Sequence, residues 1–100
     1  MARYSLSRPA REDLSEIIAY IASDSVEAAL PFSDRFEQTF VVLANNLRAG
    51  SVRPELATEI RSFPMGDYVI FYQISNGEIT IVRIRHSARD ILHEPEENLL

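Results

Sequence analysis

The sequence contains no cysteine, no lysine and no long hydrophobic run, and each absence excludes a class of protein. Without cysteine the chain forms no disulfide and offers no thiolate metal site. No apolar stretch approaches the roughly 20 residues that span a bilayer. The N-terminal residues also lack the apolar run of a signal peptide. We therefore expect a cytoplasmic protein that does not insert into a membrane.

All ten basic residues are arginine, which favours planar, bidentate contacts with carboxylate or phosphate. Fifteen acidic residues outnumber them, so the net charge is −5 and the isoelectric point is near 4.9. Non-specific nucleic-acid binding needs a surplus of positive charge. Any nucleic-acid contact must therefore be local, and we expect no direct sequence-specific DNA binding by this chain alone.

A chain of 100 residues, 46% apolar and 25% charged, has the size and composition of one compact domain. We assign residues 1–92 to this domain. Residues 93–100 contain three glutamates and a proline, which predicts an acidic C-terminal tail.

Two helices are predicted in the first half of the chain. Ser7 can cap the first, Pro9 suits its first turn, and apolar residues recur at helical spacing up to about Asp24. The second has an apolar stripe, formed by Phe32, Phe36, Phe40, Leu43 and Leu47. A short turn joins the two into an antiparallel hairpin. Pro31 leaves two alternatives, a helix kinked at this residue or a helix that begins there.

One strand is predicted before the helices and three after them. Tyr4 and Leu6 alternate with polar residues in the first, and the others span roughly residues 58–63, 68–74 and 78–85. Asn76-Gly77 is a strong signal for a type I′ hairpin. Residues 48–56 are predicted to form a loop. The order β-α-α-β-β-β predicts an α+β fold with the helical hairpin on one face of a small antiparallel sheet, whose other face is free.

The last predicted strand changes from apolar to cationic along its length. Because side chains alternate, the isoleucines at its start should share a face with Arg83 and Arg85, while Ile84 and His86 take the other face. This strand end could bind an anion or an acidic partner. Alternatively, the two arginines could simply pair with surface acids.

Several short pieces of the sequence occur in a characteristic order and spacing. They are the opening strand, Asp13-Leu14-x-x-Ile17, the phenylalanine stripe, Gly50-x-x-Arg53-Pro54-Glu55-Leu56, Arg61-x-Phe63, Tyr68-x-Ile70-x-Tyr72 and Arg83-x-x-His86-x-Ala88-Arg89-Asp90. Together they resemble the ParE branch of the RelE/ParE toxin superfamily over nearly the whole chain. The resemblance implies a RelE/ParE-like fold and the toxin half of a type II toxin–antitoxin pair with a cognate ParD-like antitoxin.

Two targets are known in this superfamily. The ParE branch poisons DNA gyrase, whereas the RelE branch cleaves mRNA at the ribosome. The acidic total charge and the absence of the basic lysines of the RelE pattern favour the ParE branch. On that interpretation the protein is not an enzyme but traps the DNA-cleaved state of gyrase by binding it. Charge placement gives the candidate target-binding residues Arg61, Arg83, Arg85, His86 and Arg89.

The alternative is a ribosome-dependent mRNA endonuclease, which needs a base, an acid and arginines around one phosphate. Glu59, Arg61, Arg85 and His86 resemble the glutamate–arginine–histidine set of some RelE-like nucleases. Whether these residues meet depends on strand register. A further alternative is an inactive relative that acts as a binding module.

The predicted antitoxin would wrap the toxin with an amphipathic helix and possibly an added strand. Tyr20, Val41 and Val42 are set off from the main apolar stripes, so with Ile17 and Ile21 they form the predicted antitoxin-binding surface, unless the sheet buries them. The histidines and nearby carboxylates show no metal-ligand spacing, so we predict no metal and no other cofactor.

Overall fold

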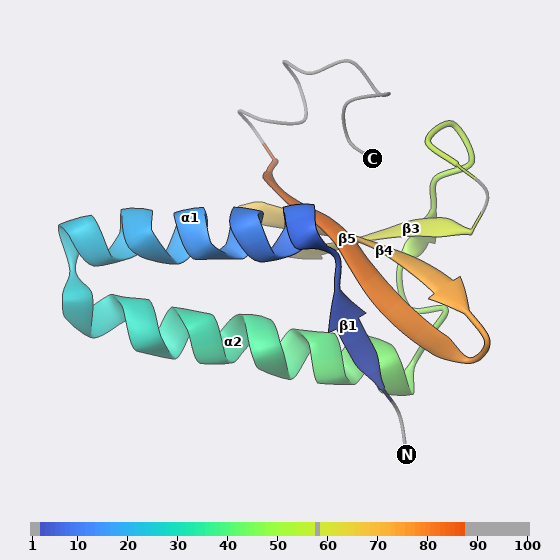
Figure 1. Cartoon of the computed structure of the whole chain (residues 1–100), viewed down its shortest axis with the longest axis horizontal. Helices are drawn as coiled ribbons and strands as arrows, with labels where there is room; N and C mark the ends of the chain where they lie inside the picture. Colours follow the sequence, from blue (N-terminus) through green and yellow to red (C-terminus); the bar gives the residue numbers. More distant parts are fainter. Residues whose placement is uncertain (1–2, 58, 88–100) are drawn as a thin grey trace.

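A computed structural model describes residues 3–57 and 59–87, which form a helical hairpin packed on a five-stranded sheet (Figure 1). The elements in chain order are β1 (Tyr4–Leu6), α1 (Arg8–Asp24), α2 (Val26–Asn45), β2 (Ser51–Val52), β3 (Ile60–Met65), β4 (Tyr68–Ser75) and β5 (Glu78–His86). The predicted domain boundary at residue 92 and the acidic tail lie outside the described residues. No helix in the described part of the chain is long and apolar enough to cross a membrane.

Serine residues define both ends of α1. The Ser7 hydroxyl accepts the Ala10 N–H at 3.1 Å, as the predicted cap requires. Ser25 ends α1, where its N–H donates to Ile21, and also caps α2 by accepting the Ala28 N–H. One residue between two helices leaves almost no loop, which fixes the antiparallel hairpin.

Helix α2 runs without interruption through Pro31. The predicted alternative, in which the helix begins at Pro31, is therefore wrong. The first turn of α2 is instead specified by the Ser25 cap, and Pro31 leaves one carbonyl of the preceding turn without its helical donor.

The sheet has the strand order β1-β5-β4-β3-β2. Strands β3 to β5 are antiparallel as predicted, and β2 pairs antiparallel to β3, but β1 pairs parallel to β5, with Tyr4 opposite Ile79. The sheet is therefore mostly antiparallel, as the predicted fold class requires, and β1 is the parallel exception, because the helical hairpin returns the chain to the same end of the sheet. Strand β2 was predicted as loop. The type I′ hairpin is confirmed, since Asn76 and Gly77 both have positive φ, 55° and 76°.

A β-bulge in β5 changes which side chains face the helices. Tyr72 pairs with Ile81 and Phe71 with Arg83, so Val82 has no partner in register. The bulge reverses the alternation, and Ile84 joins the isoleucines at the start of β5 in the core. The predicted faces of the second half of this strand, with Ile84 opposite those isoleucines, are therefore wrong.

The main core lies between the hairpin and the sheet. The phenylalanine stripe of α2 is central to it, with Phe36 and Phe40 at most 2% exposed and Phe36 5.8 Å from the Tyr68 ring. Burying such a side chain contributes about 1.5–3 kcal/mol. A smaller cluster on the opposite sheet face contains Ile60 and Phe71, packed by residues 56–57. That face, predicted to be free, is therefore partly covered.

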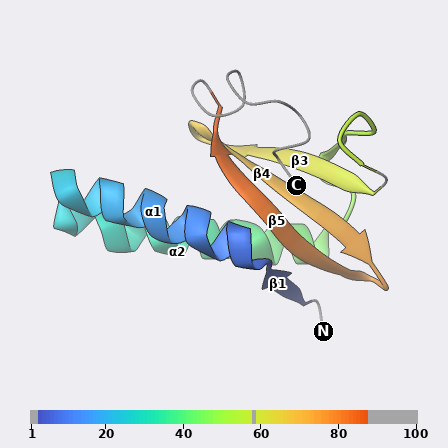
Figure 2. The same ribbon diagram turned by 45° about the horizontal axis from the view of Figure 1, so that its top comes forward.

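The helical hairpin is longer than the sheet it covers. In Figure 2 the end of α1 and the start of α2 project well beyond the strands. The helix ends nearest β1 lie against the sheet, and the opposite end does not.

Candidate functional site

An ion pair joins α1 to the second half of β5. The Asp13 carboxylate accepts from Arg83 Nε at 2.8 Å and Nη2 at 3.0 Å, and from the Ile84 N–H at 3.0 Å. The Arg83 and Asp13 side chains are only 16% and 13% exposed. Since β1 stops opposite Ile81, no other strand among the described residues pairs with this part of β5 on that side, and Asp13 supplies an acceptor to its edge. The structure thus gives Arg83 a role in holding the two layers together.

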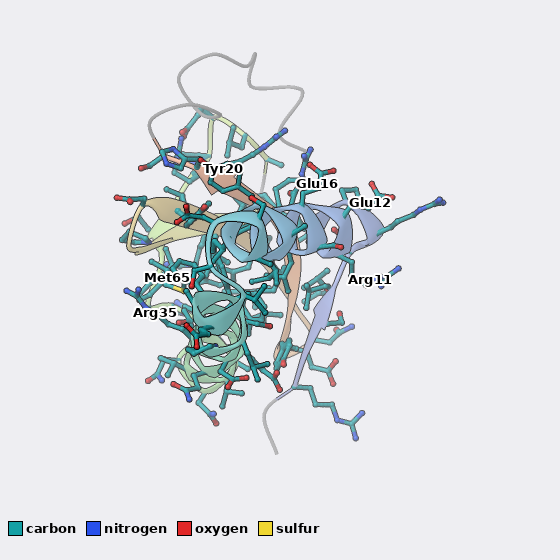
Figure 3. All side chains as sticks on the ribbon, turned by 90° about the vertical axis from the view of Figure 1, so that its left-hand side faces the viewer. Arg11, Glu12, Glu16, Tyr20, Arg35 and Met65 are labelled. Carbon is teal, nitrogen blue, oxygen red and sulfur yellow. The ribbon has the colours of Figure 1, made fainter. Side chains whose placement is uncertain are left out.

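Beside this ion pair is a hollow of about 260 Å³, which we call the β5 hollow. Its lining comes from α1, β4 and β5 and consists of Asp13, Glu16, Ile17, Tyr20, Tyr68, Ile84, Arg85 and His86. The carboxylates lie on the helix side, and Arg85 and His86 lie on the strand side. The His86 ring meets Tyr68 edge-on at 5.4 Å. Figure 3 shows Glu16 and Tyr20 projecting from the same side of α1.

Arg61 lies elsewhere, on β3, and its side chain reaches the turn that follows α2. Its Nη1 donates to the Gly50 carbonyl at 2.7 Å. The Tyr72 hydroxyl accepts the Gly50 N–H and donates to the Leu47 carbonyl, both at 2.8 Å. Arg61 and Tyr72 together fix this turn to the sheet. Arg61 therefore has a structural role in this position.

The strand register separates the residues of the nuclease hypothesis. Arg61 is opposite Tyr72, whose partner Ile81 precedes Arg85 by four residues, roughly 13 Å along the strand. The Glu59 carbonyl accepts the Ile74 N–H, level with Ile79 and roughly 23 Å from His86. Only Arg85 and His86 of the four line one hollow. Arg89, a further candidate target-binding residue, lies outside the described residues.

The predicted antitoxin-binding residues do not gather on one surface. Ile17 and Tyr20 line the β5 hollow, and Tyr20 and Ile21 line a second hollow at the end of α1. Val41 lies instead beside acidic residues of α2. Tyr20, Val41 and Val42 are 63%, 47% and 50% exposed, so the sheet does not bury these three.

A larger apolar groove of about 620 Å³, which we call the α1 groove, lies along α1 and was not predicted from the sequence. It is lined by Leu6, Arg11, Leu14, Ser15, Ile18, Ala19, Ala22 and Ser33. Leu14 and Ile18 are among the apolar residues that recur at helical spacing on α1, and both are only half-buried. The signal was the spacing of Leu14, Ile18 and Ala22, which forms a second apolar row on α1 beside the buried one.

In the described residues, no cluster of three or more histidine, cysteine, aspartate or glutamate side chains is arranged to hold a metal ion. The β5 hollow combines acidic, basic and tyrosine side chains in its lining, and the α1 groove offers apolar surface. Both features suit the binding of another molecule.

Solved toxin structures share this arrangement of helices and strands. The chain is similar to one from the chromosomal ParDE system of P. aeruginosa, with a TM-score of 0.70 and 22% identity over 86% of this chain and 96% of that one. It is also similar to one from the toxin–antitoxin complex RelBE2 of Mycobacterium tuberculosis, with a TM-score of 0.56 and 28% identity over 85% and 90% of the two chains. The fold is that of RelE/ParE toxins.

The model of the family described as ParE toxin of type II toxin–antitoxin system, parDE, matches residues 4–91. The chain therefore belongs to the ParE toxin family, and the predicted branch is confirmed. No curated protein matches it significantly in sequence.

Proposed function

We propose that this ParE-type toxin inhibits DNA gyrase and that a cognate ParD-like antitoxin neutralises it. Family membership supports the toxin–antitoxin role. The proposed action is binding, and the DNA breaks that follow arise from the chemistry of gyrase itself. The toxin would act by stabilising the cleaved state, which needs only a higher affinity for that state than for the others.

Two observations favour gyrase inhibition over mRNA cleavage. A ribonuclease needs its base, acid and arginine around one phosphate, but Glu59 and Arg61 lie far along the sheet from Arg85 and His86. The chain also carries a net charge of −5, which opposes docking into an RNA-lined site. Both observations support a toxin that works by binding a protein.

Among the candidate target-binding residues, Arg85, His86 and Arg89 are proposed to contact the target directly. Arg85 and His86 line the β5 hollow, where they can donate to a carboxylate or phosphate. Arg61 and Arg83 donate to groups within the toxin. We propose that these two arginines affect the target only through the fold.

The α1 groove is the proposed binding site for an amphipathic segment of the antitoxin. Its lining is mainly apolar, as a helix-in-groove contact requires. The antitoxin residues proposed from sequence, Ile17, Tyr20, Ile21, Val41 and Val42, would then border this contact from other faces of the hairpin.

The test combines purified toxin with DNA gyrase, ATP and supercoiled plasmid, followed by detergent and protease. We expect toxin-dependent linear plasmid, which disappears when the antitoxin is added first. A known gyrase poison provides the positive control. Absence of linear plasmid in a reaction that responds to that poison would contradict gyrase inhibition, and mRNA cleavage in a translation extract would then support the nuclease alternative.

A further inference from the structure

The free end of the helical hairpin carries unusual apolar surface. We call residues 20–30, from the last turn of α1 to the first turns of α2, the hairpin tip; it projects beyond the sheet (Figures 1 and 2). Tyr20, Val26 and Leu30 are 63%, 76% and 69% exposed there. Large apolar side chains gathered on a projecting element are typical of an interaction surface.

Val26 and Leu30 do not belong to the hydrophobic core of the described residues. Ala29 is the only buried residue of the hairpin tip, and the phenylalanine stripe that fills the core begins at Phe32. Val26 and Leu30 are one helical turn apart, so they lie side by side on α2. Their exposure therefore needs a reason other than packing within the toxin.

The surroundings of this apolar pair are acidic. Residues 12–34 contain six aspartates and glutamates and no basic residue. Glu27 and Asp34 lie three residues before and four residues after Leu30, and both are exposed on α2. At these spacings both carboxylates neighbour the Leu30 side chain. The tip thus combines apolar contact area with a negative rim.

We propose that the hairpin tip docks into an apolar pocket rimmed by basic side chains on the toxin's target protein. Val26 and Leu30 would enter the pocket, and Glu27 and Asp34 would face its positive rim. This inference rests on the proposed function, because an enzyme that handles DNA carries basic surface to neutralise phosphates. The same negative charge repels nucleic acid, so the partner of the tip is protein.

The apolar pair of the tip, Val26 and Leu30, lies outside the surfaces assigned above. The tip shares Ala22 with the α1 groove and Tyr20 with the β5 hollow, but neither Val26 nor Leu30 lines either feature. Loss of target binding and loss of antitoxin binding can therefore be measured with different variants.

The test uses two variants in the full chain, one within the tip and one at Asp34 on its acidic rim, and we call both of them tip variants. The double substitution Val26→Ser and Leu30→Ser removes the apolar pair, and Asp34→Arg reverses one charge of the rim. Val52→Ser is the matched apolar control, because Val52 is 60% exposed on the distant strand β2. Glu78→Arg is the matched charge control at the exposed start of β5. Circular dichroism melting confirms that each variant is folded.

Each protein is tested for binding to purified gyrase at low and high salt, for growth arrest on induction without antitoxin, and for co-purification with antitoxin. We expect the serine variant to bind gyrase roughly tenfold or more weakly, as at interface hot spots. Asp34→Arg should weaken binding most at low salt, where surface charges are least screened. Both controls should behave like wild type, and all variants should retain the antitoxin.

Three results would overturn the inference. Tip variants that bind gyrase and arrest growth like wild type exclude the tip as a target surface. If the tip variants no longer co-purify with the antitoxin but still bind the target, the tip is an antitoxin-binding surface. A wild-type chain that arrests no growth has no target for the tip to bind.

If the wild-type toxin arrests growth without binding gyrase, gyrase is not its target. Growth arrest by the variants then tests whether the hairpin tip docks to a target. Arrest lost only in the tip variants then supports docking to another basic protein, and arrest retained in them overturns it.

Discussion

Removing the Asp13 carboxylate should weaken the contact between the two layers of the fold. Asp13→Ala deletes the acceptor of two Arg83 hydrogen bonds and of the Ile84 N–H. Breaking a buried ion pair destabilises proteins by about 3–5 kcal/mol, and a buried amide that loses its acceptor adds about 1–3 kcal/mol. The pair retains some exposure, which lowers the penalty, so we expect a loss of about 3 kcal/mol in the free energy of unfolding.

The measurement is urea unfolding followed by circular dichroism, at constant slope m so that the midpoint reports stability. For a domain of this size the loss corresponds to a fall in melting temperature of roughly 12–24 °C. Glu12→Gln is the control, because Glu12 pairs with Arg8 on the surface, where the side chains are 62% and 83% exposed. That substitution should change stability by less than about 0.5 kcal/mol.

A double-mutant cycle separates the pair from its surroundings. Arg83→Met in the Asp13→Ala background should cost less than Arg83→Met alone, with a coupling of about 1 kcal/mol or more. If Asp13→Ala loses no more stability than Glu12→Gln, or if the coupling is zero, the ion pair does not hold α1 to β5.

Three further perturbations test other parts of the structure. Gly50→Ala should destabilise the fold by about 1–3 kcal/mol in thermal unfolding, because its Cβ would lie 2.7 Å from the Tyr72 hydroxyl; wild-type stability would contradict that packing. Ile18→Arg in the α1 groove should abolish antitoxin co-purification and leave growth arrest intact, and retained antitoxin would exclude the groove. The Arg53 hydrogen bond lowers the pKa of Glu55, so Arg53→Gln should raise it in an NMR titration, and an unchanged value would refute this cause.

Local signals in the sequence predicted much of the fold. The Ser7 cap, the phenylalanine stripe and Asn76-Gly77 each involve neighbouring residues whose chemistry prescribes one backbone geometry. The bulge at Val82 lacked such a signal, because β5 has apolar residues at both alternating sets of positions, so the sequence does not show where the alternation reverses. The parallel pairing of β1 depends on residues about 75 positions apart, which no local pattern specifies.

The candidate site was harder to predict than the fold. Arg83 looked like a ligand-binding arginine, since its partner Asp13 is 70 residues away in the sequence. Arg61 looked similar, but its acceptor is the backbone carbonyl of Gly50, which sequence cannot reveal. Arg85 and His86 were placed correctly at one strand end, and their proposed role in target binding stays a prediction.

The pairing of β1 with β5 also has a consequence for synthesis of the toxin. Strand β1, which is made before the other described elements, pairs with β5, which is made after them, with Tyr4 opposite Ile79. Until β5 has been made, α1 lacks its Asp13 anchor and the isoleucines of β5 are missing from the core. A nascent chain stopped before β5 therefore cannot complete the fold, and its hairpin emerges with apolar surface uncovered. Truncated translation products should therefore be non-toxic. Before β5 emerges, an antitoxin that is already present can bind the incomplete chain.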